Sequence, residues 1–354
     1  MSTEPVTVVA RGVLDGRGDG PGRLGTGRAH GKAILLGEHA VVYGAPALAV
    51  PVPQLTAVAK ARRAGGDGGD EISFAIAGLE SPEVTSLPTD GLQHLVTEFR
   101  QRAAVTEPMR VDVLVDCAIP QGRGLGSSAA CARAAVLALA DAFDRRLDAA
   151  TVFDLVQTSE NVAHGRASGI DALATGATAP LIFRNGVGRE LPVAMAGAAC
   201  AARASGPAGF DAVLVIADSG VSGSTRDAVE LLRGAFERSP RTRDEFVSRV
   251  TSLTEAAAHD LLQGRVADFG ARLTENHRLL REVGISTERI DRMVDAALAA
   301  GSPGAKISGG GLGGCMIALA RDRRESAAVV RSVQQAGAVR TWTVPMGRFA
   351  GHDD

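Results

Sequence analysis

Residues 120–130, with the sequence PQGRGLGSSAA, have the composition of a phosphate-binding loop. They follow an apolar alternation at 111–115, which predicts a strand, and precede an Ala- and Leu-rich segment at 127–144, which predicts a helix. The first amides of a helix lack intrahelical acceptors and carry partial positive charge, so they attract anions. The backbone could turn sharply and approach a ligand at three glycines spaced two apart: Gly122, Gly124 and Gly126. We interpret this segment as a nucleotide phosphate loop, and a glycine-rich turn with a serine cap is the alternative.

Two serines, Ser127 and Ser128, would add hydroxyl groups at the N-cap of this helix, and one of them could reach a metal ion. The loop is not a Walker A motif, because the only Gly-Lys pair of the chain, Gly31-Lys32, is followed by Ala33. It is also not a dinucleotide fingerprint, since no acidic residue ends a second strand about 20 residues later. The chemistry of the loop is therefore that of a glycine-rich anion site of another type.

A second group of polar residues lies in the segment 28–50, which contains GKAILLGEHAVVYG. Lys32 opens an apolar strand, where an ammonium group is costly unless something anionic faces it. Glu38, His39 and Tyr43 follow closely. Each of these residues alone is more typical of a surface. Together with a phosphate loop downstream, they predict a functional site.

Two carboxylates after the phosphate loop are further candidates. Glu160 lies on a helix predicted over 151–164, with Thr151 as its N-cap, and His164 shares its face. The sequence GRASGID then breaks the helix and places Asp171 in a loop or at the start of a strand, where it could project into a cleft. The alternative is an ordinary loop carboxylate in water.

A third glycine-rich segment, KISGGGLGGCMIALA, occupies residues 306–320. Such a loop is costly to order and usually persists where the backbone packs tightly against another loop or a ligand. A permissive hairpin is the alternative. The residues between 240 and 300 are helical by periodicity, and we expect an apolar stripe there to be core: Ile290, Met293, Val294, Ala297 and Leu298.

The composition excludes several classes of protein. The chain has 354 residues, enough for two domains, and 22% charged residues with a net charge of −2, which excludes a basic nucleic-acid footprint. No apolar run is long enough for a membrane span, and the N-terminus does not resemble a signal peptide. Four widely spaced cysteines indicate neither a zinc site nor a disulfide framework, so a reducing cytoplasm fits. The Gly-rich residues 1–27 predict a flexible tail.

The three glycine-containing stretches occur in an order that resembles the GHMP small-molecule kinases, and the resemblance covers roughly residues 28–347. It implies an α+β, two-domain GHMP kinase fold with the active site in the interdomain cleft. The N-terminal domain, 28–208, would be like the second domain of a small-subunit ribosomal protein. The C-terminal domain, 209–354, would be a ferredoxin-like α/β sandwich.

Within this family, the closest resemblance is to the mevalonate kinases. Gly37-Glu-His39 and the stretch HGRASGID at 164–171 match their pattern, as does Asn276-His277-x-Leu-Leu280 followed by Gly284-Ile-Ser286. Ala167 replaces the proline that is usual in the second of these elements, which affects fine specificity more than activity. No charged or metal-binding group of the pattern is missing.

The resemblance implies a role for each candidate. Backbone amides of seven residues would hold the phosphates of ATP: Gly122, Arg123, Gly124, Leu125, Gly126, Ser127 and Ser128. Ser128 and Glu160 would bind Mg²⁺. Asp171 would take the proton from the primary hydroxyl of mevalonate, and Lys32 would stabilise the anion that forms. Three further residues would help to shape the substrate pocket: Glu38, His39 and Thr225.

Two other functions remain open at this stage. One is a GHMP kinase for another small alcohol, such as phosphomevalonate or a sugar. The other is a catalytically silent relative that binds ATP to regulate a partner, although such proteins typically lose the base or the metal ligands, which are all present here: Lys32, Ser128, Glu160 and Asp171. For the kinase we expect a small-molecule substrate, no nucleic acid, no membrane and a cytoplasmic location, and the resemblance allows a homodimer.

Overall fold

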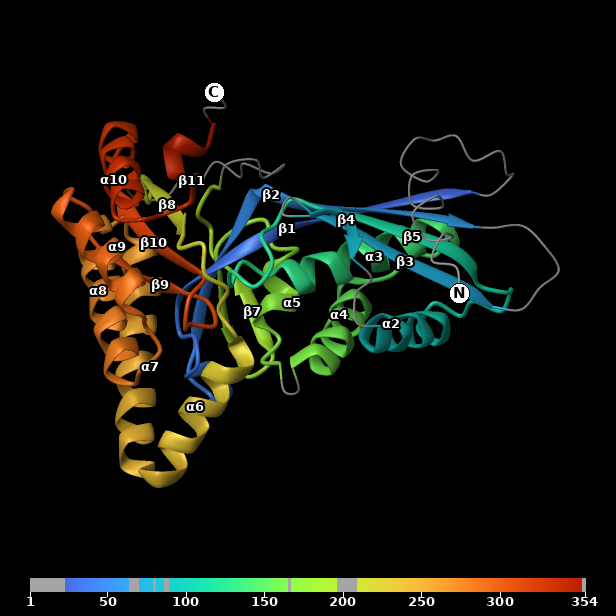
Figure 1. The fold of residues 1–354 in the computed structure, drawn as a ribbon, viewed down its shortest axis with the longest axis horizontal. Coiled ribbons are helices and arrows are strands. Elements are labelled where there is room, and N and C mark those ends of the chain that lie inside the picture. The colour runs from blue at the N-terminus through green and yellow to red at the C-terminus, as the bar shows by residue number, and fades with distance from the viewer. Residues whose placement is uncertain are drawn as a thin grey trace. The chain divides into compact units, whose positions relative to one another are not determined.

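The computed structural model describes residues 23–63, 70–78, 81–85, 89–164, 167–195 and 209–351 (Figure 1). The chain forms two compact units with mixed α+β structure. The first unit comprises Met1–Gly31, Leu55–Pro120 and Gly126–Gly176. The second comprises Lys32–Gln54, Gln121–Leu125 and Ala177–Asp354. The sequence predicts a single boundary near residue 208, whereas the two units interleave along the chain.

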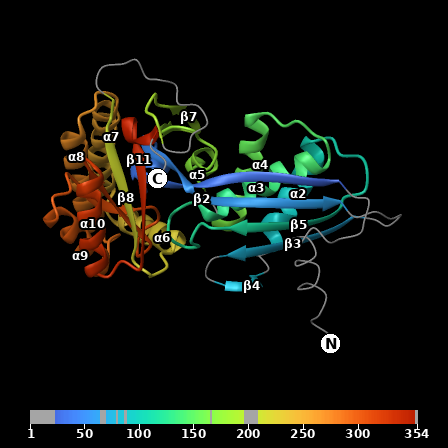
Figure 2. The ribbon, with the colours of Figure 1, turned by 90° about the horizontal axis from the view of Figure 1, so that it is seen from above.

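Four strands of the first unit lie in the order β4-β3-β5-β2, and β1 pairs with β2. β3 runs parallel to β5, and β2 runs antiparallel to β5, as the side-by-side ribbons in Figure 2 show. The strand predicted at 111–115 is confirmed as the centre of β5. The strands have these bounds: β1 (Leu24–Leu36), β2 (Ala47–Arg63), β3 (Glu71–Gly78), β4 (Ser81–Thr85) and β5 (Arg110–Cys117).

The helices of the first unit lie on one face of these strands (Figure 1). Their bounds are α2 (Thr89–Arg102), α3 (Ser127–Ala142), α4 (Ala149–His164) and α5 (Ile170–Ala174). The helix predicted over 151–164 is present, but Thr151 is not its N-cap. The helix begins two residues earlier, and the Thr151 amide donates to the Asp148 carboxylate at 2.7 Å. Asp148 therefore accepts a hydrogen bond from the first turn, the role that was predicted for Thr151.

β1 packs against α3 through backbone rather than through side chains. A β-carbon at Gly25 would lie 2.2 Å from the Ala138 carbonyl oxygen, and one at Gly27 would lie 2.1 Å from the Ala134 carbonyl oxygen. The buried face of α3 is mostly alanine, which permits this approach. Because β1 begins at Leu24, the last residues of the segment predicted to be a tail belong to a strand. Residues 1–22 of that prediction lie outside the described residues.

The second unit contains a four-stranded antiparallel sheet in the order β11-β8-β10-β9. The strands have these bounds: β8 (Ala212–Asp218), β9 (Ala305–Ser308), β10 (Cys315–Ala320) and β11 (Arg340–Met346). A shorter ladder joins Ala47–Ala49 of β2 to β6 (Leu181–Arg184), which pairs with β7 (Val187–Glu190). Two 3-10 helices are η1 (Val41–Tyr43) and η2 (Gly347–Gly351).

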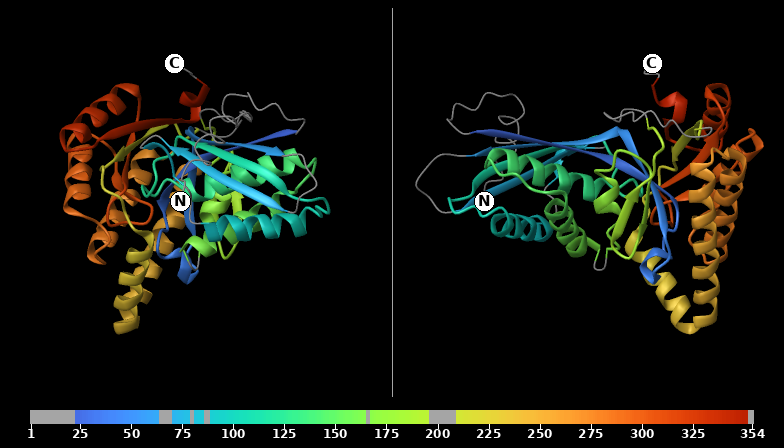
Figure 3. Two further views of the ribbon diagram at one scale, coloured as in Figure 1. Left: turned by 45° about the vertical axis from the view of Figure 1, so that its right-hand side comes forward. Right: turned by 180° about the vertical axis from the view of Figure 1, so that it is seen from behind.

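Five helices accompany this sheet, and α7 lies alongside α8 (Figure 3). Their bounds are α6 (Thr225–Arg238), α7 (Pro240–Leu262), α8 (Val266–Glu282), α9 (Glu288–Ala299) and α10 (Arg323–Gln335). The predicted core stripe on α9 is confirmed, because four of its five residues are buried and Leu298 packs against them. No helix of the described ranges is long and apolar enough to cross a membrane.

Strand alternation separates two faces of this sheet. Ile307 of β9 belongs to the apolar core together with residues of α8 and α9. Successive side chains of a strand point to opposite faces, so the two neighbours of Ile307, Lys306 and Ser308, point away from that core. Both are nevertheless buried, and their partners come from the segment around Ile34 and Glu38. Lys306 and Ser308 are therefore on the face opposite α8 and α9.

Candidate functional site

Lys32 is tied to the predicted phosphate loop by two hydrogen bonds. Its ammonium donates to the Gly124 carbonyl at 3.0 Å, and its amide donates to the Leu125 carbonyl at 3.0 Å. The side chain is buried, and its charge lowers the pKa of Glu38, although burial, the larger effect, raises that pKa. The Lys32 charge and the Glu38 carboxyl group therefore interact electrostatically, and a role of Lys32 beside a bound anion stays a prediction.

Glu38 and Lys306 form a buried ion pair. The Lys306 ammonium donates to the Glu38 carboxylate and to the Ile307 carbonyl, and Lys306 is fully buried. Burial raises the pKa of Glu38, and the charges of Lys306 and Lys32 oppose this increase. Burial also lowers the pKa of Lys306, and the Glu38 carboxylate opposes that decrease. The second carboxylate oxygen, Glu38 Oε2, is buried and has no hydrogen-bond partner among the described residues.

His39 has an unusual backbone conformation. Its φ of 62° lies in the left-handed region, which is sparsely populated by residues other than glycine, and it follows Gly37 at φ 97° by two positions. Burial and the Lys306 charge lower the pKa of His39 to about 4, against a hydrogen bond with the Gly310 backbone. The imidazole is therefore neutral at pH 7. Backbone strain of this kind is concentrated at functional sites, which supports the prediction for His39.

Three glycine-rich segments of the second unit pack backbone against backbone. A β-carbon at Gly124 would lie 3.0 Å from the Ser308 carbonyl oxygen, and one at Gly223 would lie 2.4 Å from the Gly311 carbonyl oxygen. A β-carbon at Gly310 would lie 2.2 Å from Thr225 Oγ1. The third glycine loop is therefore packed tightly against other loops, which favours that explanation over a permissive hairpin. Thr225, a predicted substrate residue, is exposed at the start of α6.

The side chain of Arg123 points into the protein. Its Nε lies 3.0 Å from the Asp218 carboxylate, and its guanidinium donates to Ser222 Oγ at 2.6 Å and to the Gly220 carbonyl at 3.3 Å. Asp218 is fully buried, and Arg123 is nearly so. The charge of Arg123 thus anchors the loop to the end of β8. A role of this residue in nucleotide binding would rest on its backbone amide, as predicted.

In the first unit, the phosphate loop continues into α3. Gly126, at φ 76°, is the N-cap, and no described side chain caps this terminus. The expectation that Ser127 and Ser128 lie at the N-cap is thus wrong, because both are already in the helix. Ser128 is exposed. An N-terminus without a side-chain cap presents amides and the positive end of the dipole, as an anion site requires.

The predicted magnesium ligands lie on two helices of the first unit that pack together, α3 and α4. Glu160 on α4 is buried. The Cys131 thiol is one turn after Ser128, and its pKa is raised by a hydrogen bond with Cys117, by burial and by the Glu160 charge. The negative charge of Glu160 thus acts on a thiol in the second turn of α3. A carboxylate and a hydroxyl oxygen fit a hard divalent cation, although the described residues contain no cluster of three or more His, Cys, Asp or Glu side chains that could hold a metal.

Asp171 is the second residue of α5 rather than part of a loop or strand, and it is half-buried. The helix starts after Gly169, whose φ of 97° provides the turn into it. Arg133 of α3 donates to the Ala172 carbonyl at 3.2 Å, and burial lowers the pKa of this arginine. Arg133 thus connects α3 to the short helix that carries Asp171, a contact that the sequence analysis missed.

The structure groups the candidates by unit. Lys32, Glu38, His39, Thr225 and the loop Gln121–Leu125 belong to the second unit. Five others belong to the first unit: Gly126, Ser127, Ser128, Glu160 and Asp171. That both sets serve one reaction stays a prediction.

Two further polar residues beside β9 were not predicted as functional. Lys306 is one, although a lone lysine in an apolar strand is the same signal that identified Lys32. His277 on α8 is the other: its Nδ1 accepts from the Ile307 amide at 3.4 Å, and its Nε2 lies 3.3 Å from Asp291. Burial lowers the pKa of His277 to about 4, although the Asp291 carboxylate opposes this.

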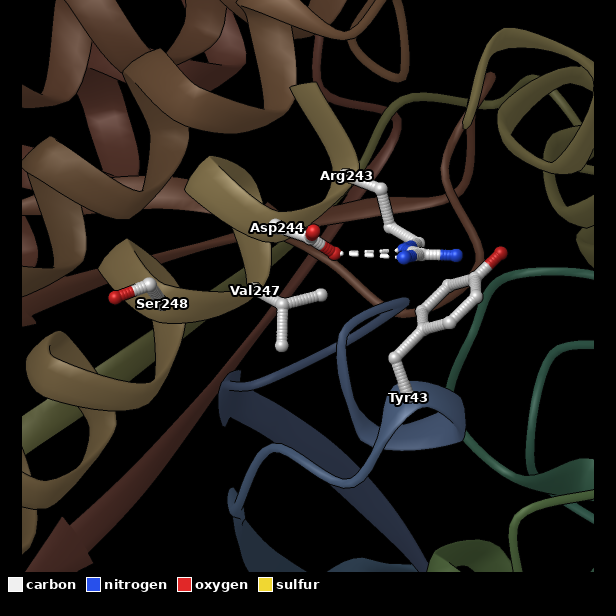
Figure 4. Close-up of a pocket in the computed structure, with 5 residues that line it drawn as sticks. All are labelled: Tyr43, Arg243, Asp244, Val247 and Ser248. Carbon is white, nitrogen blue, oxygen red and sulfur yellow. Dashed lines mark hydrogen bonds and ion pairs between the residues drawn. The ribbon is translucent and has the colours of Figure 1, made fainter. Parts of the chain in front are cut away.

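A pocket of about 380 Å³ lies between η1 and the start of α7 in the second unit. Figure 4 shows Asp244 directed toward the Arg243 guanidinium, 2.8 Å away, with the Tyr43 ring beside them. Tyr43 also packs edge-on against Phe236. The residues that line the pocket are Tyr43, Arg243, Asp244, Val247 and Ser248. Of these, only Tyr43 belongs to the polar group that the sequence analysis identified in residues 28–50.

Two domain models of one kinase family match this chain. The GHMP kinases N terminal domain matches residues 92–177, and the GHMP kinases C terminal domain matches residues 257–339. A mevalonate kinase from Thermococcus sibiricus is 31% identical over 317 residues, which cover 84% of this chain and 89% of that protein.

Solved structures share the fold. The L. major mevalonate kinase in complex with R-mevalonate is 21% identical, with a TM-score of 0.73 over 91% of this chain and 96% of that chain. The Lactococcus lactis galactokinase complexed with galactose is 18% identical, with a TM-score of 0.72 over 98% of both chains. At these identities, the likeness concerns the fold and not the substrate. Because the similarity in sequence extends over most of the chain and both domain types occur in order, the chain belongs to the GHMP kinase family of ATP-dependent small-molecule kinases.

Proposed function

We propose that this kinase transfers the γ-phosphoryl group of ATP to the primary (C5) hydroxyl of mevalonate and so produces 5-phosphomevalonate. One observation carries the choice of substrate: the 31% identity to a mevalonate kinase over 84% of the chain. The fold alone does not discriminate, since a galactokinase is as similar in structure as a mevalonate kinase is.

The nucleotide would be held by the loop from Gly122 to Ser128. Gly122, Gly124 and Gly126 have φ angles of 64°, 75° and 76°, which turn the backbone in a way that other residues adopt rarely. The N-terminus of α3, which lacks a side-chain cap among the described residues, adds amides and a favourable dipole. The positions of Lys32 and Gly309 against Gly124 support the shape of this loop.

Ser128 and Glu160 would hold Mg²⁺, because they offer the hydroxyl and carboxylate oxygens that this ion prefers. When bound, the ion would neutralise negative charge on the β- and γ-phosphates. The protein's own part is to keep Glu160 buried on α4, a helix that packs against α3.

Asp171 would accept the proton of the primary hydroxyl as this oxygen attacks the γ-phosphorus. Lys32 would stabilise the negative charge that develops, since its buried ammonium is held at the Gly124 carbonyl of the phosphate loop. Phosphoryl transfer depends mainly on alignment and charge neutralisation, so a single base and a few fixed cations are sufficient for catalysis.

Glu38, His39 and Thr225 would recognise the substrate. The Glu38 Oε2 atom, which lacks a partner among the described residues, can accept a hydrogen bond from a substrate hydroxyl. The neutral His39 ring can donate or accept one. These polar groups support a small polyhydroxy or hydroxy-acid substrate.

A direct test is to measure ADP release by the purified protein with ATP, Mg²⁺ and a panel of alcohols: mevalonate, phosphomevalonate, galactose and homoserine. We expect mevalonate to have the highest kcat/KM, and NMR to locate the new phosphate on C5. A higher kcat/KM for another alcohol would assign the enzyme to that substrate. Absence of ADP release with the whole panel would contradict the proposal.

A further inference from the structure

Lysine is rare in this chain. Of the 38 lysine and arginine residues, only three are lysines: Lys32, Lys60 and Lys306. Two of them, Lys32 and Lys306, are buried in the second unit. An ammonium group is compact and can lose its proton, whereas a guanidinium is a wide planar fork that stays charged. A chain that otherwise uses arginine therefore has an ammonium at two buried positions, which indicates that the small size of the cation matters there.

Lys306 lies where two of the three motifs meet. Its ammonium donates to Glu38, which follows β1, and to the Ile307 carbonyl of its own strand. Two residues later, the Ser308 hydroxyl donates to the Ile34 carbonyl at 2.9 Å. β9 then leads directly into the glycine loop that packs on Gly124. Lys306 thus connects the Glu38 segment to the strand that positions the third glycine loop.

Among the described residues, the charged groups that act on Glu38 are Lys306 and Lys32. Lys306 from β9 has the largest favourable effect on the carboxylate, and Lys32 from β1 has a smaller one. His39, beside Glu38, and His277, on α8, both have pKa values of about 4, so neither contributes positive charge at neutral pH. Two further charges, Asp291 and Arg281, act on His277. Lys306 is therefore the main group that opposes protonation of the buried Glu38.

We propose that Lys306 is a positioning residue for the kinase reaction: it keeps Glu38 ionised and oriented, so that Glu38 Oε2 accepts a hydrogen bond from a hydroxyl group of the substrate. This inference rests on the proposed function, because the hydroxyl belongs to the alcohol substrate. Lys306 touches neither the substrate nor the nucleotide in this role. Its ammonium is occupied by Glu38 and Ile307, and it acts through the carboxylate.

The pH dependence of kcat/KM for mevalonate tests this role. Replacing Lys306 by methionine (K306M) keeps the length of the side chain but removes the charge, so Glu38 should become protonated near neutral pH. We expect kcat/KM at pH 7 to fall by at least about tenfold for each unit by which the carboxyl pKa exceeds 7, and to recover as the pH rises toward 9. KM for ATP should stay within about twofold. The double variant K306M/E38Q should lack this recovery. A loss that is the same at every pH, or a recovery that persists in the double variant, would overturn the proposal.

Two controls separate this inference from the proposed function. Lys60→Met is the matched substitution, on β2 of the first unit, and should leave the pH profile unchanged. If the wild type and Lys60→Met both fail to phosphorylate mevalonate, the proposed function fails. If both are active and the Lys306→Met profile is parallel to theirs, only the inference on Lys306 fails.

Glu38→Gln alone provides a second route if Lys306→Met does not fold, since it leaves Lys306 in place. We expect it to lower kcat/KM for mevalonate by more than about tenfold, with an unchanged KM for ATP. Wild-type kcat/KM in this variant would overturn the proposal as well.

Discussion

A β-carbon at Gly25 would collide with backbone and one at Gly124 would make a tight contact of 3.0 Å with it, but the surroundings of the two glycines differ. Gly25 brings a strand close to an alanine-rich helix in the first unit. Gly124 brings one loop close to another in the second unit, with the buried Lys32 ammonium bonded to its carbonyl. Glycine marks close backbone packing in both places. Only in the second are buried charges present beside it, so buried charge, and not glycine alone, distinguishes a candidate site from a packing contact.

The largest expected effect concerns Asp171. This residue belongs to the first unit, where the glycine contact at Gly25 is only a packing contact. Asp171→Asn removes the proposed base with almost no change in size, so kcat should fall by a factor of about 10²–10⁴. Unfolding by denaturant should remain as in the wild type. Near-normal kcat with mevalonate would remove Asp171 from the mechanism and would leave the reaction to the second unit.

The glycines themselves provide the next test. Gly25→Ala should lower the free energy of unfolding by about 1–3 kcal/mol, because the new methyl group would overpack the strand against α3, while kcat/KM per folded molecule is unchanged. Gly124→Ala should cost about 1–2 kcal/mol from its left-handed backbone and should lower kcat/KM by about tenfold or more.

Denaturant unfolding and steady-state kinetics on both variants separate these two effects. The contrast between the two regions would be lost if Gly25→Ala reduced kcat/KM as strongly as Gly124→Ala did. Gly186→Ala is a useful control for the left-handed conformation alone, since its φ is 81° and no atom lies within 4 Å of its added β-carbon.

The smallest effect concerns acid stability, through the neutral histidines of the second unit. His277 has a pKa of about 4 in the folded protein, against an ordinary value of 6.5, so the unfolded chain binds more protons between these two values. Stability should therefore be full above about pH 6.5 and should decrease as the pH falls toward 4. His277→Gln should reduce this slope by up to about 1.4 kcal/mol per pH unit, as measured by denaturant unfolding at several pH values. An unchanged slope would mean that His277 is not the group responsible.

Local patterns in the sequence were sufficient to predict most elements, because strands, helices and glycine loops follow from neighbours in the chain. The strand around Val113, the helix after Gly126 and the buried stripe on α9 are examples. The cap at Asp148 was missed because two plausible capping residues lie close together and only the three-dimensional structure distinguishes them.

Contacts between distant segments could not be predicted in the same way. Nothing near Glu38 in the chain indicates that Lys306 is its partner, and nothing near Arg123 indicates Asp218. The roles of Lys32, Glu38 and Asp171 were assigned from the resemblance of their motifs, while the structure provides the pairings inside each unit. The roles of these residues in catalysis depend on the substrate and stay predictions.

The interleaving of the two units restricts how the protein can be divided. The chain passes between them within β1, at Gly31 and Lys32, and again within β2, at Gln54 and Leu55. A single cut therefore cannot yield two self-sufficient fragments, because neither unit is encoded by one continuous stretch of the chain. Expression of either half alone should produce an incomplete polypeptide, and the enzyme has to be studied, engineered and evolved as one folding entity.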